Sequence, residues 1–296
     1  MRPELEQAVK LLRKEDTNSI QEALRLLQDT IFSFSMKLCG HREDAEDTMQ
    51  EVLANSLRHL AKIEDPRALS VWLYTAARNR CWRNRKKDAN RRAVSLDELM
   101  PGEAELNTLL SASSTSPEQQ VLRDEDSHLV HKAVLRLPPQ YRIVLVLHDM
   151  EELDTGQTAQ VLSLQPGTAR VRLHRARLLL RKEMDAMFHP FPKKSRRHRT
   201  PMKMRSHECQ KIFGNLSEYL DGQMQVRDCE QMRAHIEACP QCVAFIRDLK
   251  LAIDRCRSLE ISPDGNTGAS LRRLLADEYL RLIETRISEI SATTPS

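Results

Sequence analysis

Hydrophobic residues recur at helical spacing along most of this chain. Between residues 20 and 39, Leu24, Leu27 and Ile31 follow one another at intervals of three or four positions, so they share one face of a helix. Gly40 comes directly after this run, where a helix C-cap is expected. Similar patterns predict further helices over residues 41–60, 67–92, 155–162, 166–182, 243–256 and 269–290.

The helix predicted to begin at Pro166 has two unlike faces. Proline is tolerated there because the first turn of a helix leaves its N–H groups unpaired. The predicted buried stripe consists of Ala169, Leu173, Ala176 and Leu180. The opposite side contains Arg170, Val171, His174 and Leu178, with Arg175 and Arg177 at its edges. Such a helix suits a DNA major groove. The alternative is an ordinary amphipathic helix with a solvated basic face.

Composition supports an all-α fold and points to a polyanionic partner. Aromatic residues make up only 4% of the 296 residues, and there are only 8 glycines. The net charge of +4 is unevenly distributed, because residues 170–205 contain thirteen Lys and Arg against two acids, whereas residues 97–126 contain eight acids and one Arg. A basic block beside an acidic one suggests nucleic-acid binding. A solvated charge run is the alternative interpretation.

Apolar runs and cysteine usage indicate the compartment. No stretch of eighteen apolar residues occurs, and the first residues do not resemble a signal peptide. We therefore expect a cytoplasmic protein that does not enter a membrane. Seven cysteines in a reducing compartment suggest thiols or metal ligands rather than a disulfide framework.

One cysteine-containing string has the spacing of a metal site. His235 and Cys239 are four residues apart, so they lie one helical turn apart on one face, and Pro240 ends that helix so that Cys242 can turn back. One imidazole and two thiolates arranged in this way suit tetrahedral Zn²⁺, and a fourth ligand must come from elsewhere.

Residues 135–184 resemble the −35-reading domain of the extracytoplasmic-function (ECF) class of sigma-70-family sigma factors. The matching residues are Leu137-Pro138-Pro139, Gly167-Thr168 and the string RLHRAR at 172–177. The sequence departs from the family at Gly156-Gln157, where an acidic residue is usual, and at Val171, where a small polar residue is common. The first departure leaves the fold intact, whereas the second bears on which bases are read. The resemblance implies DNA contacts from Thr168, Arg170, Val171, His174, Arg175 and Arg177.

Two strings nearer the N-terminus resemble the other ECF sigma domain, which docks on core RNA polymerase and reads the −10 element. They are HREDAEDTMQEV at 41–52 and VWLYTAARNR at 71–80. The resemblance implies binding to the polymerase clamp by Asp44, Asp47, Gln50 and Glu51, and carboxylates on one helix face suit an arginine-rich partner. In promoter opening, Trp72 and Tyr74 either stack on bases or line the core, with the core favoured for Trp72. Phosphate contacts are expected from Arg78, Asn79, Arg83 and Arg85.

The region around the metal string resembles the zinc-binding module of anti-sigma proteins, and the match includes 219–222, YLDG. In that family the fourth ligand is a Cys or His near the start of the module. This implies Cys209 beside His235, Cys239 and Cys242, with His207 and Cys229 as alternatives. The last helix has an apolar stripe that includes Leu275, Tyr279 and Leu282, and such a stripe needs a groove to cover it.

The predicted organisation is two helical sigma domains and a small helical zinc module. The boundaries are 1–92 for the polymerase-binding and −10 domain, 93–125 for an acidic linker, 126–187 for the helix-turn-helix domain, 188–206 for a basic linker and 207–296 for the C-terminal module. The polar acidic linker is expected to carry no packed structure.

The leading hypothesis is a sigma factor that brings core RNA polymerase to promoters and is regulated by its own C-terminal module, which folds back on the sigma domains. The main alternative is a helix-turn-helix regulator with a zinc- or redox-sensing domain that does not act with core polymerase. A zinc enzyme is disfavoured because no HExxH string occurs and four protein ligands leave no open position on the metal.

Overall fold

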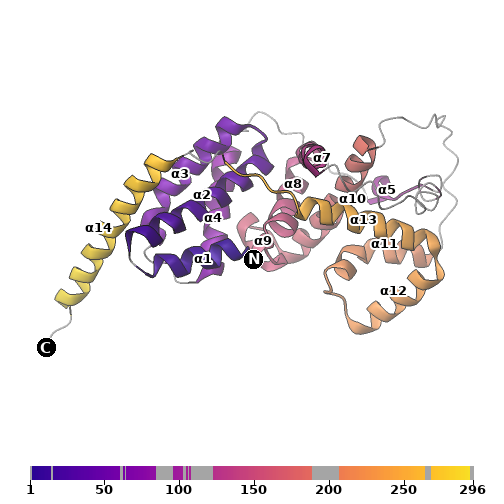
Figure 1. The fold of residues 1–296 in the computed structure, drawn as a ribbon. Helices are drawn as coiled ribbons and strands as arrows, with labels where there is room; N and C mark the ends of the chain where they lie inside the picture. The colour runs from indigo at the N-terminus through magenta and orange to yellow at the C-terminus, as the bar shows by residue number, and fades with distance from the viewer. Residues whose placement is uncertain are drawn as a thin grey trace. The chain divides into compact units, whose positions relative to one another are not determined.

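The computed structural model describes residues 2–14, 16–60, 63, 65–84, 96–102, 105, 107, 123–188, 207–263 and 268–293. Every regular element among them is a helix, so the all-α prediction is confirmed (Figure 1). The helices are α1 (Pro3–Leu12), α2 (Thr17–Cys39), α3 (Arg42–Leu60), α4 (Pro66–Asn84), α5 (Leu96–Leu99), α7 (Arg123–Arg136), α8 (Pro139–Leu145), the π-helix η2 (Val146–Met150), α9 (Thr155–Leu162), α10 (Pro166–Phe188), α11 (His207–Leu220), α12 (Val226–Ala238), α13 (Pro240–Arg257) and α14 (Ala269–Thr293).

The chain divides into two compact units. The first unit contains Met1–Ala89, Val146–Gln165 and Glu260–Ser296, and the second contains Asn90–Leu145 and Pro166–Leu259. The basic linker predicted at 188–206 lies outside the described residues except for Phe188. None of the helices in the described ranges combines the length and the apolar character that a membrane crossing requires.

In the first unit, α1, α3 and α4 pack around α2. Asp16 caps the start of α2 by accepting a hydrogen bond of 2.8 Å from the backbone N–H of Ser19. Gly40 ends the helix with φ 74°, in the left-handed conformation, as the sequence predicts. The predicted core residues Leu24, Leu27 and Ile31 are all buried.

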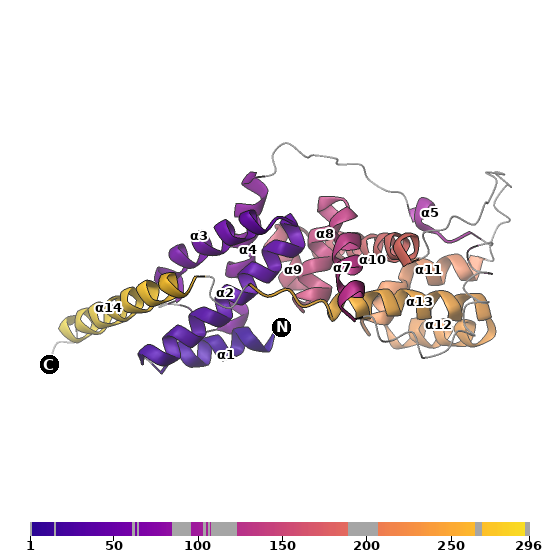
Figure 2. The ribbon, with the colours of Figure 1, turned by 45° about the horizontal axis from the view of Figure 1, so that its top comes forward.

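The last helix, α14, packs along α2 and α3 in the same unit (Figures 1 and 2). Leu275 and Tyr279 of the predicted stripe are buried, so these two helices supply the groove that the stripe requires. Arg272 donates a hydrogen bond to Gln28 Oε1 at 2.5 Å. Gly268, just before α14, has φ 75°, and a side chain there would lie 3.0 Å from the Gln28 amide, so both the turn and the close approach favour glycine.

In the second unit, α10 packs against α7, α8, α11 and α13. All four residues of its predicted stripe are buried. One apolar cluster joins α10 to the C-terminal module and consists of Leu99, Leu178, Phe213, Leu216, Met232, Phe245, Leu249 and Ile253. The module is thus built around the same core as part of α10.

The acidic linker differs from its expected unpacked state at α5. Leu99 belongs to the cluster just described, and Leu96 and Met100 pack against it. These three apolar residues are spaced at three and four positions, which places them on one side of a single helical turn. Low average hydrophobicity hid this short amphipathic segment.

The start and end of α9 define the turn that leads to α10. Asp154 and Gln157 form a capping box: the Gln157 N–H donates to Asp154 Oδ1 at 2.8 Å, and the Asp154 N–H donates to Gln157 Oε1 at 3.1 Å. The departure from the family at Gly156-Gln157 therefore leaves the helix start intact. Ser163 ends α9 in the left-handed conformation, with φ 54°, which makes the tight break that the sequence predicts.

Candidate DNA-recognition helix and metal centre

The first turns of α10 are open to solvent. Thr168, Arg170 and Val171 are exposed, and Val171 retains 52% of its accessible surface. In helix-turn-helix proteins, the N-terminal residues of the recognition helix contact base edges. These three side chains have the accessibility that a base-reading role requires, and Arg175 is half-buried.

Arg177 is the most deeply buried of the predicted DNA-contacting residues. Its guanidinium donates hydrogen bonds of 2.7 and 2.9 Å to the two carboxylate oxygens of Asp221, and its side chain has 0% exposure. Bidentate pairing of this kind is among the strongest geometries for an arginine. In this structure the module therefore covers Arg177, and its contact with DNA stays a prediction.

His174 is buried in the same contact. Its Nδ1 lies 3.0 Å from the Ser217 hydroxyl oxygen, and the Phe213 ring meets it edge-on with the ring centres 6.3 Å apart. Burial, followed by the charges of Arg177 and Arg175, lowers the pKa of His174 to about 4. His174 is thus neutral at pH 7 and is buried in this structure, and its contact with DNA stays a prediction.

Arg181 extends this contact and was not among the predicted site residues. It pairs with Asp248 of α13 at 3.0 Å and with Glu105 of the linker, and it stacks over the Phe245 ring with its Cζ 4.6 Å from the centroid. Burial raises the pKa of Asp248 even though Arg181 acts in the opposite direction. The signal was present in the sequence, since Arg181 follows Arg177 by one helical turn and shares its face.

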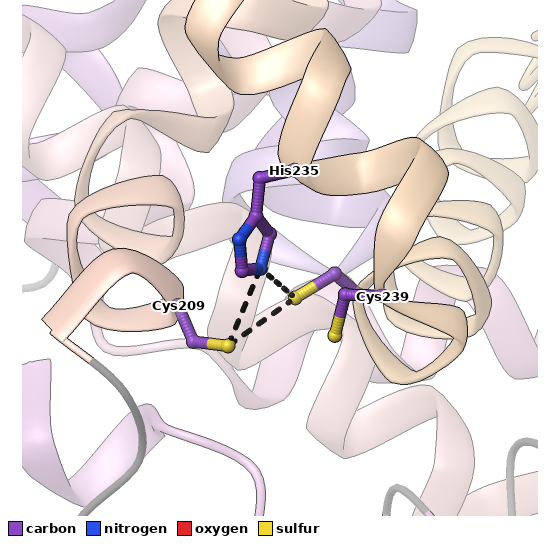
Figure 3. Close-up of side chains that lie close together, drawn as sticks. Cys209, His235 and Cys239 are labelled. Atoms are coloured by element: carbon purple, nitrogen blue, oxygen red, sulfur yellow. Dashed lines mark hydrogen bonds between the residues drawn. The ribbon is translucent and has the colours of Figure 1, made fainter.

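Four side chains of the C-terminal module converge on one point. They come from α11 (Cys209), from α12 and the residue after it (His235 and Cys239), and from the first turn of α13 (Cys242), and their ligand atoms all lie within 4.8 Å of one another. Figure 3 shows the thiol of Cys209 pointing towards the imidazole of His235, with Cys239 beside them. Cys209 Sγ is 3.4 Å and Cys242 Sγ 3.6 Å from His235 Nε2, and the two sulfurs are 3.9 Å apart.

These separations fit a tetrahedral zinc site. With Zn–S bonds of about 2.3 Å and Zn–N bonds of about 2.0–2.1 Å, the edges of such a tetrahedron are about 3.6–3.8 Å long. The predicted ligand set is the one that the structure brings together. Cys229 does not belong to the cluster, and the side chain of His207 lies outside the described residues.

The residues predicted to open DNA have different environments on α4. Tyr74 is 1% exposed and donates a hydrogen bond of 2.8 Å to Glu151, so it lines the core and does not present a stacking surface. Trp72 is half-buried, with its ring centre 4.6 Å from that of His59. Arg78 is half-buried and Asn79 is exposed, whereas the side chain of Arg83 and the whole of Arg85 lie outside the described residues.

The predicted polymerase-binding residues lie along α3. Asp47 and Gln50 are exposed, and Asp44 and Glu51 are half-buried. Glu51 pairs with Arg80 of α4. An acidic surface is therefore present on α3, as the sequence predicts.

Comparison with known families accounts for three parts of the chain. Residues 23–92 match the family model "Sigma-70 region 2", residues 127–180 match "Sigma-70, region 4", and residues 209–242 match "Putative zinc-finger". The chain is a sigma factor of the ECF class in the sigma-70 family. Its C-terminal zinc-finger domain is of a kind typical of anti-sigma factors.

Curated relatives agree with this assignment. The ECF RNA polymerase sigma factor SigW of Bacillus subtilis is 28% identical over 183 residues, which cover 61% of this chain and 96% of the relative. The RNA polymerase sigma-H factor of Pseudomonas aeruginosa is 27% identical over 188 residues, covering 62% of this chain and 94% of the relative. The ECF RNA polymerase sigma factor SigE of Mycolicibacterium smegmatis is 30% identical over 167 residues, covering 55% of this chain and 60% of the relative.

Family membership assigns the helices to regions. The helices from α2 to α4 belong mainly to region 2, and those from α7 to α10 to region 4. Sigma factors bind core RNA polymerase and promoter DNA, and they catalyse no covalent reaction. The expectation that the chain is not an enzyme is thereby confirmed.

Proposed function

We propose that this sigma factor directs core RNA polymerase to specific promoters and that its C-terminal module holds it in an inhibited state by occupying region 4. One observation carries the second half of the proposal. Arg177 of the recognition helix is buried in a bidentate pair with Asp221 of the module.

Promoter recognition and polymerase binding use solvent-exposed surfaces of regions 2 and 4. Thr168, Arg170 and Val171 at the exposed start of α10 read the −35 element, and Val171 offers only apolar contact, which suits a thymine methyl group. The acidic residues of α3 dock on the polymerase clamp. The α4 helix and the loop before it open the −10 element.

The inhibited state follows from what covers the rest of α10. Arg177, an expected DNA contact, is paired with a carboxylate, and so is Arg181 one helical turn further along α10. Asp221, Asp248 and Glu105 thus supply the negative charge that DNA phosphates would otherwise supply. Since one guanidinium cannot serve a carboxylate and a phosphate in the same way at once, DNA must compete with the module.

Helix α14 adds a second contact, on region 2. It packs along α2 and α3, and α3 is the helix that contains the acidic polymerase-binding residues. Asp47 and Gln50 of α3 remain exposed. The principal block is therefore assigned to region 4, with α14 as a second anchor for the module.

We assign Zn²⁺ to Cys209, His235, Cys239 and Cys242, as a structural ion with four protein ligands. Two of the ligands, Cys209 and Cys242, lie on the helices α11 and α13 that pack against α10. Cys209 precedes Phe213 by one turn of α11, and Cys242 precedes Phe245 on α13 by three residues. Because metal binding and folding are coupled in sites of this type, metal loss or thiol oxidation would loosen both helices and free region 4.

Run-off transcription with core polymerase tests the proposal on the full-length chain. Asp221→Asn removes the charge partner of a buried arginine, which typically destabilises such a contact by about 3 kcal/mol or more, so transcription should rise. Glu230→Gln changes an exposed acid of the same module and should leave transcription as in the wild type.

Equal or lower transcription from Asp221→Asn, with wild-type helix content by circular dichroism, would show that the contact is not inhibitory. A chain that gives no core-dependent transcription under any condition would instead favour the helix-turn-helix regulator that acts without polymerase.

A further inference from the structure

Glu151 of region 4 is buried among side chains from the N-terminal part of the chain. Its carboxylate lies 2.8 Å from Lys37 Nζ, 2.8 Å from the Tyr74 hydroxyl and 3.0 Å from Arg2 Nε. The side chains of Glu151 and Lys37 both have 0% exposure. Lys37 and Tyr74 belong to region 2, so this cluster joins region 2 to region 4 inside the first unit.

Because Glu151 and Lys37 are buried, their charges are stable only while the two side chains remain paired. A lysine or glutamate that is removed from water is tolerated only when it is paired and hydrogen-bonded. Lys37 on α2 and Glu151 after η2 satisfy each other, although they are 114 residues apart in the sequence. Separation of the regions must therefore hydrate both charges, which gives the contact two defined states, closed and open.

The backbone at Glu151 is unusual in a way that fits a functional contact. Glu151 directly follows the π-helix η2, and its N–H donates to the carbonyl of Val146 at 2.9 Å, five residues back. The next residue, Glu152, has φ 57° and is not a glycine. Short π-helical segments and left-handed residues of this kind are enriched at functional sites. Together they position the Glu151 carboxylate towards α2 and α4.

A second hydrogen bond links the same two regions. Arg78 of α4 donates to the carbonyl of Val161 in the last turn of α9 at 2.5 Å. Helix C-termini present unpaired carbonyl groups that favour a cation. Arg78 is expected to grip promoter phosphates, so in this state region 4 occupies a DNA-binding group of region 2.

Promoter recognition is incompatible with this contact, an argument that rests on the proposed function. The −35 and −10 elements are about 25 base pairs apart, or roughly 85 Å at about 3.4 Å per base pair. Regions joined through Glu151 cannot reach both elements together. We propose that Glu151 acts as a latch, meaning that its contacts with Lys37, Tyr74 and Arg2 hold region 4 against region 2. Promoter binding then requires these contacts to break. None of these four residues belongs to the C-terminal module, so the latch is a second restraint, independent of zinc.

Amide hydrogen exchange on the full-length protein, without polymerase or DNA, tests the latch. Glu151→Gln keeps the size of the side chain but removes its charge. Exchange should become roughly tenfold faster or more in residues 146–162 and also around Lys37 and Tyr74. Glu152→Gln is the matched control, because it changes an exposed neighbour and should leave both segments as in the wild type.

A substitution in region 2 must also affect region 4. Lys37→Met should accelerate exchange in residues 146–162, in a region that it does not itself belong to. If either variant changes only its own region, or neither changes any exchange rate, the proposal is wrong. Promoter-dependent transcription is measured in parallel: its absence would overturn the sigma-factor function and leave the latch standing, whereas normal transcription with uncoupled exchange would overturn the latch alone.

Discussion

His174 illustrates how the C-terminal module changes the chemistry of one side chain. The sequence places it on the DNA-facing side of the recognition helix, but in the structure it lies against Ser217 and Phe213. Its Nε2 is buried, with no hydrogen-bond partner among the described residues. Neutral imidazole tolerates this position better than imidazolium, because a second N–H would have no acceptor there.

We therefore expect acid to loosen the contact between the module and α10. The pKa of His174 is about 4 in the folded protein, below its ordinary value of 6.5, so the stabilisation is complete above about pH 6.5 and is lost as the pH falls towards 4. At pH 5 the loss is about 2 kcal/mol. The thermal midpoint of the wild type should fall more between pH 7.5 and pH 5 than that of His174→Gln. Equal falls in the two proteins would contradict this role. Both proteins have the same metal ligands, so protonation of the ligands lowers both thermal midpoints alike and does not affect their difference.

The periodicity of the sequence predicted which face of α10 each residue lies on, but it did not predict which residues contact that face. The stripe from Ala169 to Leu180 is buried as predicted, and Arg170 and Val171 are exposed as predicted. The side chains that cover His174 and Arg177 come from residues 39 to 44 positions later, a separation that no local pattern reveals. Glu151 was missed for the same reason, since its partners are 77 or more positions away.

Helices α11, α12 and α13 meet at the metal cluster, and here local pattern was sufficient. The His-x3-Cys-x2-Cys spacing fixes three ligands within eight residues, across the end of one helix and the start of the next. The fourth, Cys209, came from resemblance to the anti-sigma module, and its Sγ lies 3.4 Å from His235 Nε2. Helix α5 was missed because one amphipathic turn is too short for a periodic signal.

Substitution of a ligand should unfold the module as a unit. Cys209→Ser should lower bound zinc from about one ion per chain and reduce helix content, because three short helices depend on one site. Cys229→Ser should leave both unchanged, since Cys229 lies outside the cluster. Metal analysis of the purified, reduced protein with far-ultraviolet circular dichroism measures both quantities. Zinc loss in Cys229→Ser but not in Cys209→Ser would overturn the ligand assignment.

The whole chain joins a sigma factor to a zinc-finger domain of a kind typical of anti-sigma factors. Because the two are covalently linked by about nineteen residues, their local concentration is on the order of millimolar. A contact weak enough to be reversed by metal loss can still dominate at this concentration. Under the proposed inhibition, dilution is not expected to release a tethered module, so we expect release to require a change in the module or a competing partner such as DNA.

Removal of the module should therefore activate the factor. A chain that ends at Met187 lacks both the α11–α13 cover on α10 and the α14 contact on region 2, so run-off transcription with core polymerase should rise.

Leu275→Glu should imitate part of this effect, because it places a charge at a residue that is 8% exposed between α14 and region 2. Leu274→Glu is its matched control, since the neighbouring residue is 68% exposed. If the truncated chain transcribes no more than the full-length chain, in both reduced and oxidised protein, the module serves another purpose. If it transcribes more while Leu275→Glu does not, inhibition resides in region 4 alone and α14 is only an anchor.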